Sequence, residues 1–260
     1  MGGALIILLL WIVFGGSHLL FASPPTRDAV VGRLGEQRFV LIYSLFAAAS
    51  FTALALAFGL YHDQGLPGLA LGRWPLVRAG LVAVGFAGAL IMVLGVLSYF
   101  HSPMAIFRTE LRPPLGIERI TRHAFFVGTV LLMGAHALLA PTLAGAAFFA
   151  GFVVLALAGI PLQDRKLLRR YGDAYARYVE STSTVPFAAI LRRRQRFNRD
   201  DGWGRLLVAG VVGALALFAL HPLWRATYGL PIAFLIGGSG LYIVARRWSK
   251  ARRPSHSAVE

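Results

Sequence analysis

The chain has 260 residues, of which 57% are hydrophobic and 14% charged, and its mean hydropathy is +0.66. Soluble globular domains contain roughly 45–50% apolar and about 25% charged residues. This composition excludes a disordered chain and argues against a soluble domain. The absence of cysteine excludes disulfides, thiolate metal sites and cysteine nucleophiles.

The charge is strongly basic, with 26 Lys and Arg against 11 Asp and Glu and a net charge of +15. Such an excess is typical of nucleic-acid binding in a soluble protein. In a membrane protein it instead fixes topology against the anionic leaflet. We therefore expect the lipid bilayer and anionic phospholipid as partners, and no nucleic acid.

Seven apolar segments are predicted, each close to the roughly 20 residues that cross a hydrocarbon core. They cover residues 4–22, 39–61, 77–99, 123–140, 143–162, 205–221 and 230–245. The expected fold class is all-α, a polytopic transmembrane bundle of about seven helices. We divide the chain into a transmembrane domain (1–225), an additional C-terminal transmembrane helix (226–248) and a disordered polar tail (249–260).

The loops between these segments differ in charge. Of the 26 Lys and Arg, 23 fall in the odd-numbered loops and the C-terminal tail, and 3 in the even-numbered loops. The positive-inside rule then predicts an N-terminus outside and a cytoplasmic C-terminus. We expect a multi-pass protein of the cell inner (plasma) membrane.

The longest polar stretch covers residues 163–204. Its apolar side chains fall on one face of a helix: Leu167, Leu168, Tyr171, Tyr175 and Tyr178. This pattern predicts an amphipathic helix lying on the cytoplasmic membrane surface. A basic cluster follows that is suited to phospholipid headgroups, namely Arg192, Arg193, Arg194 and Arg196.

Histidine is the ionisable residue that remains inside or at the ends of the apolar segments, where acids and Lys or Arg are nearly absent. His18 lies in the first segment, His123 opens the fourth and His136 lies deep within it. Two imidazoles from different helices suit haem b, and Arg119 and Arg122 are placed to pair with its propionates. The alternative is that each histidine only donates a hydrogen bond to a neighbouring helix.

Helix geometry constrains which histidines act together. His123 and His136 are 13 residues apart, so on one helix they differ by about 220° in direction and about 20 Å in height. They cannot both ligate one iron. His18 lies near the inner end of its segment, so its depth matches His123 better than His136.

Four stretches carry a resemblance to a known family. They read GGSHLLFASPPTRDAVVGRLGEQRFVLIYSL, RITRHAFFVGTVLLMGAH, QDRKLLRRYGDAYARY and TSTVPFAAIL. In this order and spacing they resemble the NnrU family of bacterial membrane proteins and the related 15-cis-zeta-carotene isomerases, over residues 10–225. NnrU proteins are associated with denitrification and nitric oxide metabolism.

The resemblance implies a haem b protein in which His18 and His136 are the axial metal ligands. His123, which the depth comparison favours, becomes a reserve ligand or a residue supporting the ligands. Two positions depart from the family pattern: Ala124 replaces a proline, and Met133 replaces a cysteine. The enzyme class implied is a haem-dependent, redox-controlled cis–trans isomerase acting on a lipophilic small molecule, with no catalytic residue assigned.

Three hypotheses for function stay open at this point. The first is the haem protein, isomerising a lipophilic polyene or handling nitric oxide. The second is an S-adenosylmethionine-dependent membrane methyltransferase, weakened by Ala124 and by Gln163-Asp164 in place of an acidic pair. The third is a non-catalytic membrane assembly factor whose basic loop docks a partner.

Overall fold

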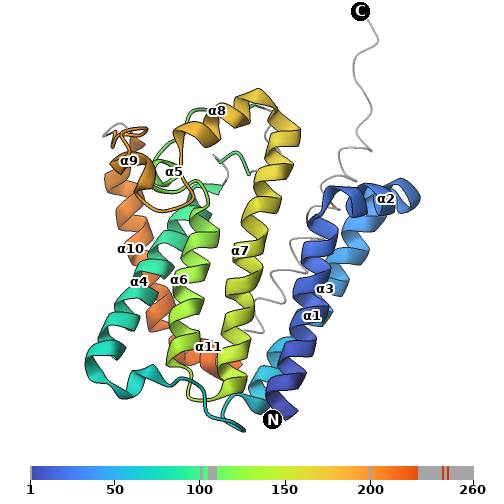
Figure 1. Ribbon diagram of the computed structural model, residues 1–260, viewed down its shortest axis with the longest axis vertical. Coiled ribbons are helices and arrows are strands. Elements are labelled where there is room, and N and C mark those ends of the chain that lie inside the picture. Colours follow the sequence, from blue (N-terminus) through green and yellow to red (C-terminus); the bar gives the residue numbers. More distant parts are fainter. Residues whose placement is uncertain are drawn as a thin grey trace, which may run out of the picture.

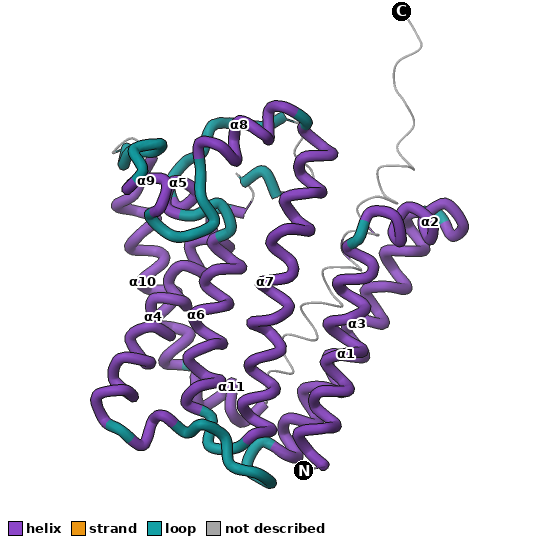
Figure 2. Tube along the Cα trace, viewed as in Figure 1, coloured by secondary structure: helices purple, strands orange, loops and turns teal. Residues whose placement is uncertain are grey.

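The computed structural model describes residues 2–99, 102–104, 110–198 and 201–227, together with Tyr242 and Ala245. Helices account for all the regular elements in these residues, and the described part contains no strand (Figure 2). The predicted all-α fold class is confirmed. Apart from Tyr242 and Ala245, the predicted segment 230–245 and the tail 249–260 lie outside the described residues.

Six of the predicted apolar segments coincide with helices. These are α1 (Gly2–Ala22), α3 (Glu36–Tyr61), α4 (Pro75–Leu97), α6 (Ala124–Leu139), α7 (Leu143–Tyr171) and α10 (Trp203–Ala219), the last followed after a 51° bend by α11 (His221–Thr227). By length and composition α1, α3, α4 and α7 can each cross a membrane, and α10 with α11 makes a fifth, bent candidate. The chain therefore has the helices of a multi-pass membrane protein.

The short elements gather mainly at one end of the bundle. They are α2 (Pro24–Leu34), η1 (Leu71–Arg73), α5 (Ile117–Ile120), α8 (Asp173–Ser181) and α9 (Ala188–Leu191). Figure 1 shows α2, α5, α8 and α9 at the same end, which we call the capped end. The first, third and fifth loops, which are rich in arginine, all lie there. This is the arrangement that the alternating loop charge requires, while the side of the membrane stays a prediction.

Helix α7 lies at the centre, with α1 against one side and α6 against the other (Figure 1). Helices α4 and α6 approach most closely, because glycine stands on both sides of their crossing. A Cβ atom on Gly128 would lie 2.4 Å from the backbone N of Met92 and 2.6 Å from the carbonyl O of Gly88. Small residues at such a crossing allow the backbones to touch.

Aromatic side chains fill the contact between α1, α3 and α7. Trp11 donates from Nε1 to the carbonyl of Phe148 at 3.0 Å, and its ring packs against Phe14 and Phe152. Gly151 makes room for the indole, since a Cβ there would lie 2.1 Å from a ring carbon of Trp11. This core fixes α1 on α7.

The predicted amphipathic helix differs from the expectation in two respects. Helix α7 continues to Tyr171, Gly172 takes a φ of 54°, and α8 follows as a separate helix. Its inner face also contacts protein rather than lipid: the three side chains buried against Met104 and Leu111 are Leu167, Tyr175 and Tyr178. Leu168, expected on the same face, is exposed, although its neighbour Leu167 on α7 is buried.

Candidate functional site

Asp164, near the C-terminal end of α7, accepts hydrogen bonds from three side chains. Its Oδ1 lies 2.8 Å from Nε2 of His123 and 2.6 Å from the hydroxyl of Tyr175, and its Oδ2 lies 2.9 Å from Nη2 of Arg122. We call these four residues the Asp164 cluster. Such charge-assisted bonds are shorter and stronger than neutral ones.

Backbone pairing brings the motifs together at this point. Thr121 donates from its hydroxyl to the carbonyl of Thr184 at 2.7 Å, and the N–H of Arg122 donates to the carbonyl of Ser183 at 2.9 Å. The RITRH and TSTVPF stretches therefore lie side by side, and α6 begins immediately after His123. The turn at Gly172 folds α8 back so that Tyr175 reaches Asp164.

The ring of His123 is held with one nitrogen free. Its side chain is 1% exposed, and its Nδ1 has no hydrogen-bond partner in the described part of the chain. An ionised carboxylate only accepts, so Nε2 carries the proton that binds Asp164, and Nδ1 is the ring nitrogen left without a partner. A buried nitrogen without a partner is costly, which marks it as a candidate functional atom.

The hydroxyl of Tyr175 is fixed as a donor. Burial and the adjacent carboxylate of Asp164 raise the pKa of Tyr175 above its ordinary value. The phenol therefore stays protonated at neutral pH and donates to Asp164. Together with Arg122, it holds the carboxylate in place beneath His123.

Two more ion pairs flank the Asp164 cluster. Arg119 donates from Nε to Oδ2 of Asp201 at 2.6 Å and from Nη1 to Gln195 at 2.9 Å, while Arg112 pairs with the buried Glu118 at 2.8 Å. Arg119 and Arg122, predicted to pair with haem propionates, thus each bind a protein carboxylate already.

The structure does not bring the predicted axial ligands together. His136 lies three residues before the end of α6, at the end of the bundle where α1 begins, whereas His18 lies four residues before the end of α1 at the capped end (Figure 1). At 1.5 Å per residue this separates them by about 20 Å in height. His123, the N-cap of α6, shares the capped end with His18, as the depth comparison predicted.

The ring contacts of the histidines also differ. The ring of His18 lies 5.3 Å from that of Tyr43, and Nδ1 of His18 bonds to the carbonyl of Phe14. The ring of His136 lies 5.0 Å from that of Phe149 and 6.1 Å from that of His221. In this arrangement His18 and His136 do not fit one iron, and we derive no chemistry through haem, which stays a prediction. No group of three or more His, Asp or Glu within the described ranges could hold a metal ion.

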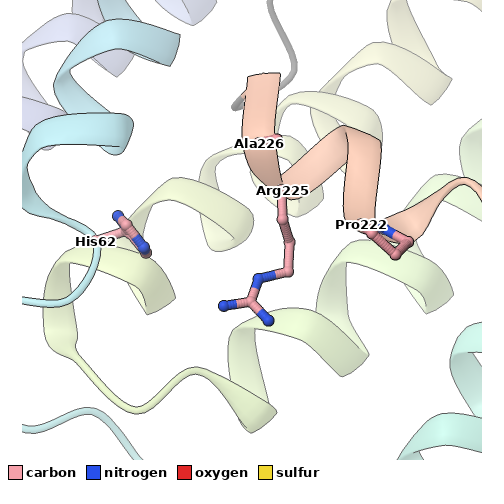
Figure 3. A pocket seen from close by; sticks show the side chains of 4 residues that line it. All are labelled: His62, Pro222, Arg225 and Ala226. Atoms are coloured by element: carbon pink, nitrogen blue, oxygen red, sulfur yellow. The ribbon is translucent and has the colours of Figure 1, made fainter.

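An open pocket lies at the opposite end of the bundle from the Asp164 cluster. It has a volume of about 320 Å³ and is lined by His62, Pro222, Arg225 and Ala226 (Figure 3). Figure 3 shows the Arg225 side chain extending from α11 toward the side where His62 lies. None of the four stretches that carry the resemblance contributes to its lining, so we do not assign it as the candidate site.

Sequence reasoning missed the residues that organise the candidate site. Asp164 and Tyr175 were not identified as functional, and neither were the acidic partners Glu118 and Asp201. One signal was available for Asp164: it is the first acid after a long apolar segment, within a family motif. Its pairing with His123 could not be read from spacing, because the two residues lie on different helices.

A bundle of membrane-crossing helices with a histidine–aspartate–arginine–tyrosine cluster at one end defines a multi-pass membrane protein with an internal polar site. The family model described as "NnrU protein" matches residues 6–227. The chain belongs to this family, which confirms the resemblance.

Two relatives carry an enzymatic name. The chain is 39% identical over 120 residues to 15-cis-zeta-carotene isomerase, chloroplastic, of Zea mays, covering 45% of this chain and 33% of the relative. It is 28% identical over 203 residues to the protein of the same name from Arabidopsis thaliana, covering 75% and 52%. The chain thus spans between a third and about half of the length of these relatives. No solved structure matches it.

Proposed function

We propose that this chain is a membrane isomerase that changes the geometry of a double bond in a lipophilic polyene. The similarity to two proteins named 15-cis-zeta-carotene isomerase supports this class of reaction. The candidate membrane spans support it too, because a polyene dissolves in the lipid that such helices cross. The working region is the Asp164 cluster.

The observation that carries the assignment of the site is the convergence of three motifs. RITRH supplies Arg122 and His123, QDRKLLRRYGDAYARY supplies Asp164 and Tyr175, and TSTVPF is hydrogen-bonded to the first. Residues that carry a family resemblance and also meet at one carboxylate are candidates for the family's chemistry. His123, with Nδ1 free, is the residue through which the cluster meets a ligand.

Isomerisation is tested with the purified chain in liposomes that contain 15-cis-zeta-carotene, kept in darkness in oxidised and in dithionite-reduced buffer. Extracted pigment is separated by chromatography. The proposal predicts a loss of the 15-cis isomer and an equal gain of another isomer of the same mass. Unchanged pigment in both buffers, with protein shown to be folded by circular dichroism, contradicts the proposal.

A redox role through haem b, either in this isomerisation or in nitric oxide metabolism, is a finer proposal that rests on the resemblance alone. An absorption spectrum of the reduced protein before and after addition of nitric oxide tests it independently of the pigment assay. If S-adenosylmethionine binds and no isomer forms, the methyltransferase alternative is favoured instead. If neither ligand binds nor any isomer forms, the assembly factor is favoured.

A further inference from the structure

The segment from Val185 to Phe197, which we call the rim segment, exposes apolar and basic side chains together at the capped end. Its exposed apolar residues are Val185 (65% exposed), Phe187 (46%), Leu191 (80%) and Phe197 (59%). Its exposed basic residues are Arg192, Arg193, Arg194 and Arg196. Exposed apolar side chains beside a cluster of positive charge mark an interaction surface.

The rim segment has a fixed shape despite its exposure. The N–H of Phe187 donates to the carbonyl of Ile120 at 3.0 Å. Gln195 accepts from Arg119 at 2.9 Å, and Arg194 donates from Nη1 to the carbonyl of Glu180 at 2.6 Å. The segment is therefore bound to the RITRH stretch and to α8 at several points, which fix its backbone.

Backbone strain points to the same segment. Phe187 has a φ of 63° and Arg193 a φ of 57°, both in the left-handed region that favours glycine. An aromatic residue there is an outlier, and such conformations persist only where the surroundings fix them. In this conformation the aromatic ring of Phe187 lies at the surface.

The rim segment lies where a lipid-facing helix begins. Figure 1 shows α9 beside the start of α10. The outer face of α10 is apolar and open, with Val208 and Val212 exposed. The ring of Phe197 lies 5.8 Å from that of Trp203, the first residue of α10. Aromatic residues at the end of a spanning helix mark the level of the lipid headgroups.

We propose that the rim segment binds the headgroup of an anionic phospholipid of the surrounding bilayer. Arg192, Arg193 and Arg196 make no ion pair within the described ranges, so their charges are available to a phosphate. Phe187 and Leu191 reach the adjacent acyl region. This site lies outside the Asp164 cluster and does not depend on the proposed isomerase activity.

Lipid retention tests this site. The detergent-purified protein is exchanged into mixed micelles containing equal amounts of phosphatidylglycerol and phosphatidylcholine, and the lipid that remains bound after washing is measured by mass spectrometry. The wild type is expected to retain phosphatidylglycerol preferentially. In the variant R192Q/R193Q/R196Q, each lost arginine is expected to lower the ratio of retained phosphatidylglycerol to retained phosphatidylcholine by about fivefold. Arg194 is left unchanged because it supports the fold.

Two further variants separate binding from general charge and from folding. R33Q/R38Q/R177Q removes the same charge from exposed positions outside the rim segment, in α2, α3 and α8, and should keep the preference. Phe187→Gly removes the ring while easing the backbone, so it should fold normally and retain less of both lipids. The proposal is overturned if the wild type shows no preference, or if the two triple variants lose it equally.

Discussion

Nε2 of His123 lies 2.8 Å from Oδ1 of Asp164, although 41 residues separate the two in the chain. His123 precedes α6, and Asp164 ends the apolar part of α7. The bond is made possible by the tight α6–α7 hairpin at the far end of the bundle, which sets the two helices side by side. Around this contact the family's motifs meet, and the carboxylate fixes which nitrogen of the ring stays free.

Replacing the central carboxylate should destabilise the protein. Asp164→Asn leaves the Arg122 guanidinium without its counter-charge and turns an amide N–H toward the donors of the Asp164 cluster. Removing one partner of a buried ion pair lowers the free energy of unfolding by about 3–5 kcal/mol. Because the side chain of Asp164 is 23% exposed, we expect a smaller loss of about 2–3 kcal/mol. Thermal unfolding in detergent should show a fall in Tm of about 5–10 °C. The matched control is Asp28→Asn, because the ion pair of Asp28 with Arg169 is exposed. This substitution should lower the free energy of unfolding by less than about 0.5 kcal/mol. Equal shifts in the two variants contradict a special role for Asp164.

The crossing of α4 and α6 should not tolerate a methyl group. In Gly128→Ala the new Cβ would meet the backbone of Met92 and Gly88, so the helices must move apart. Such overpacking costs about 1–3 kcal/mol. Gly80→Ala is the control, because nothing lies within 4 Å of its Cβ position. Comparing Tm for the two variants checks the crossing, and an unchanged Tm for Gly128→Ala would show that these helices lie further apart.

Acid should weaken the capped end through Asp201. Burial of this carboxylate opposes ionisation, but the hydrogen bonds from Arg119 and from the N–H of Gly116 outweigh it and lower the pKa of Asp201. A lowered pKa in the folded state gives stability that is present above the unfolded pKa of about 3.9 and is lost as the pH falls through the folded pKa. Between pH 6 and pH 3 the wild type should lose more stability than Asp201→Asn, as measured by thermal unfolding. If Tm falls equally with pH in the wild type and in Asp201→Asn, Asp201 does not contribute to the loss of stability in acid.

Absorption spectra of histidine variants test the haem prediction against the fold. If the protein binds haem b, the family resemblance predicts that the spectrum depends on His18 and His136. The structure instead places His221 beside His136, with ring centroids 6.1 Å apart. Loss of the six-coordinate spectrum in His18→Ala and His136→Ala, with His221→Ala unaffected, would require α1 and α6 to be arranged differently from the structure. Loss in His136→Ala and His221→Ala, with His18→Ala unaffected, would agree with it.

The sequence predicts the helices well because a long apolar run is a local property. Six segments coincide with helices. The break at Gly172 was missed because the helical periodicity of Leu167 and Tyr171 carries through it. Burial of Tyr175 depends on Met104 and Leu111, which lie far away in the chain and leave no trace in the local pattern.

The candidate site was predicted in part for a related reason. His123 was identified because a histidine at the start of an apolar segment is conspicuous. Asp164 was passed over because an acid just beyond a segment looks like ordinary surface charge. Its role follows from its pairing with His123 and Tyr175 across two further elements, which depends on how α6, α7 and α8 pack.

Turnover per folded molecule tests the central claim, that the Asp164 cluster serves chemistry and not folding alone. His123→Gln keeps an amide N–H near Asp164 but removes the free ring nitrogen, and Gly128→Ala lowers stability without touching the cluster. Each is assayed in liposomes with 15-cis-zeta-carotene, at a temperature where circular dichroism shows both to be folded. We predict that His123→Gln loses at least about tenfold in rate, equivalent to about 1.4 kcal/mol, while Gly128→Ala retains the wild-type rate. Wild-type turnover in His123→Gln would contradict the account.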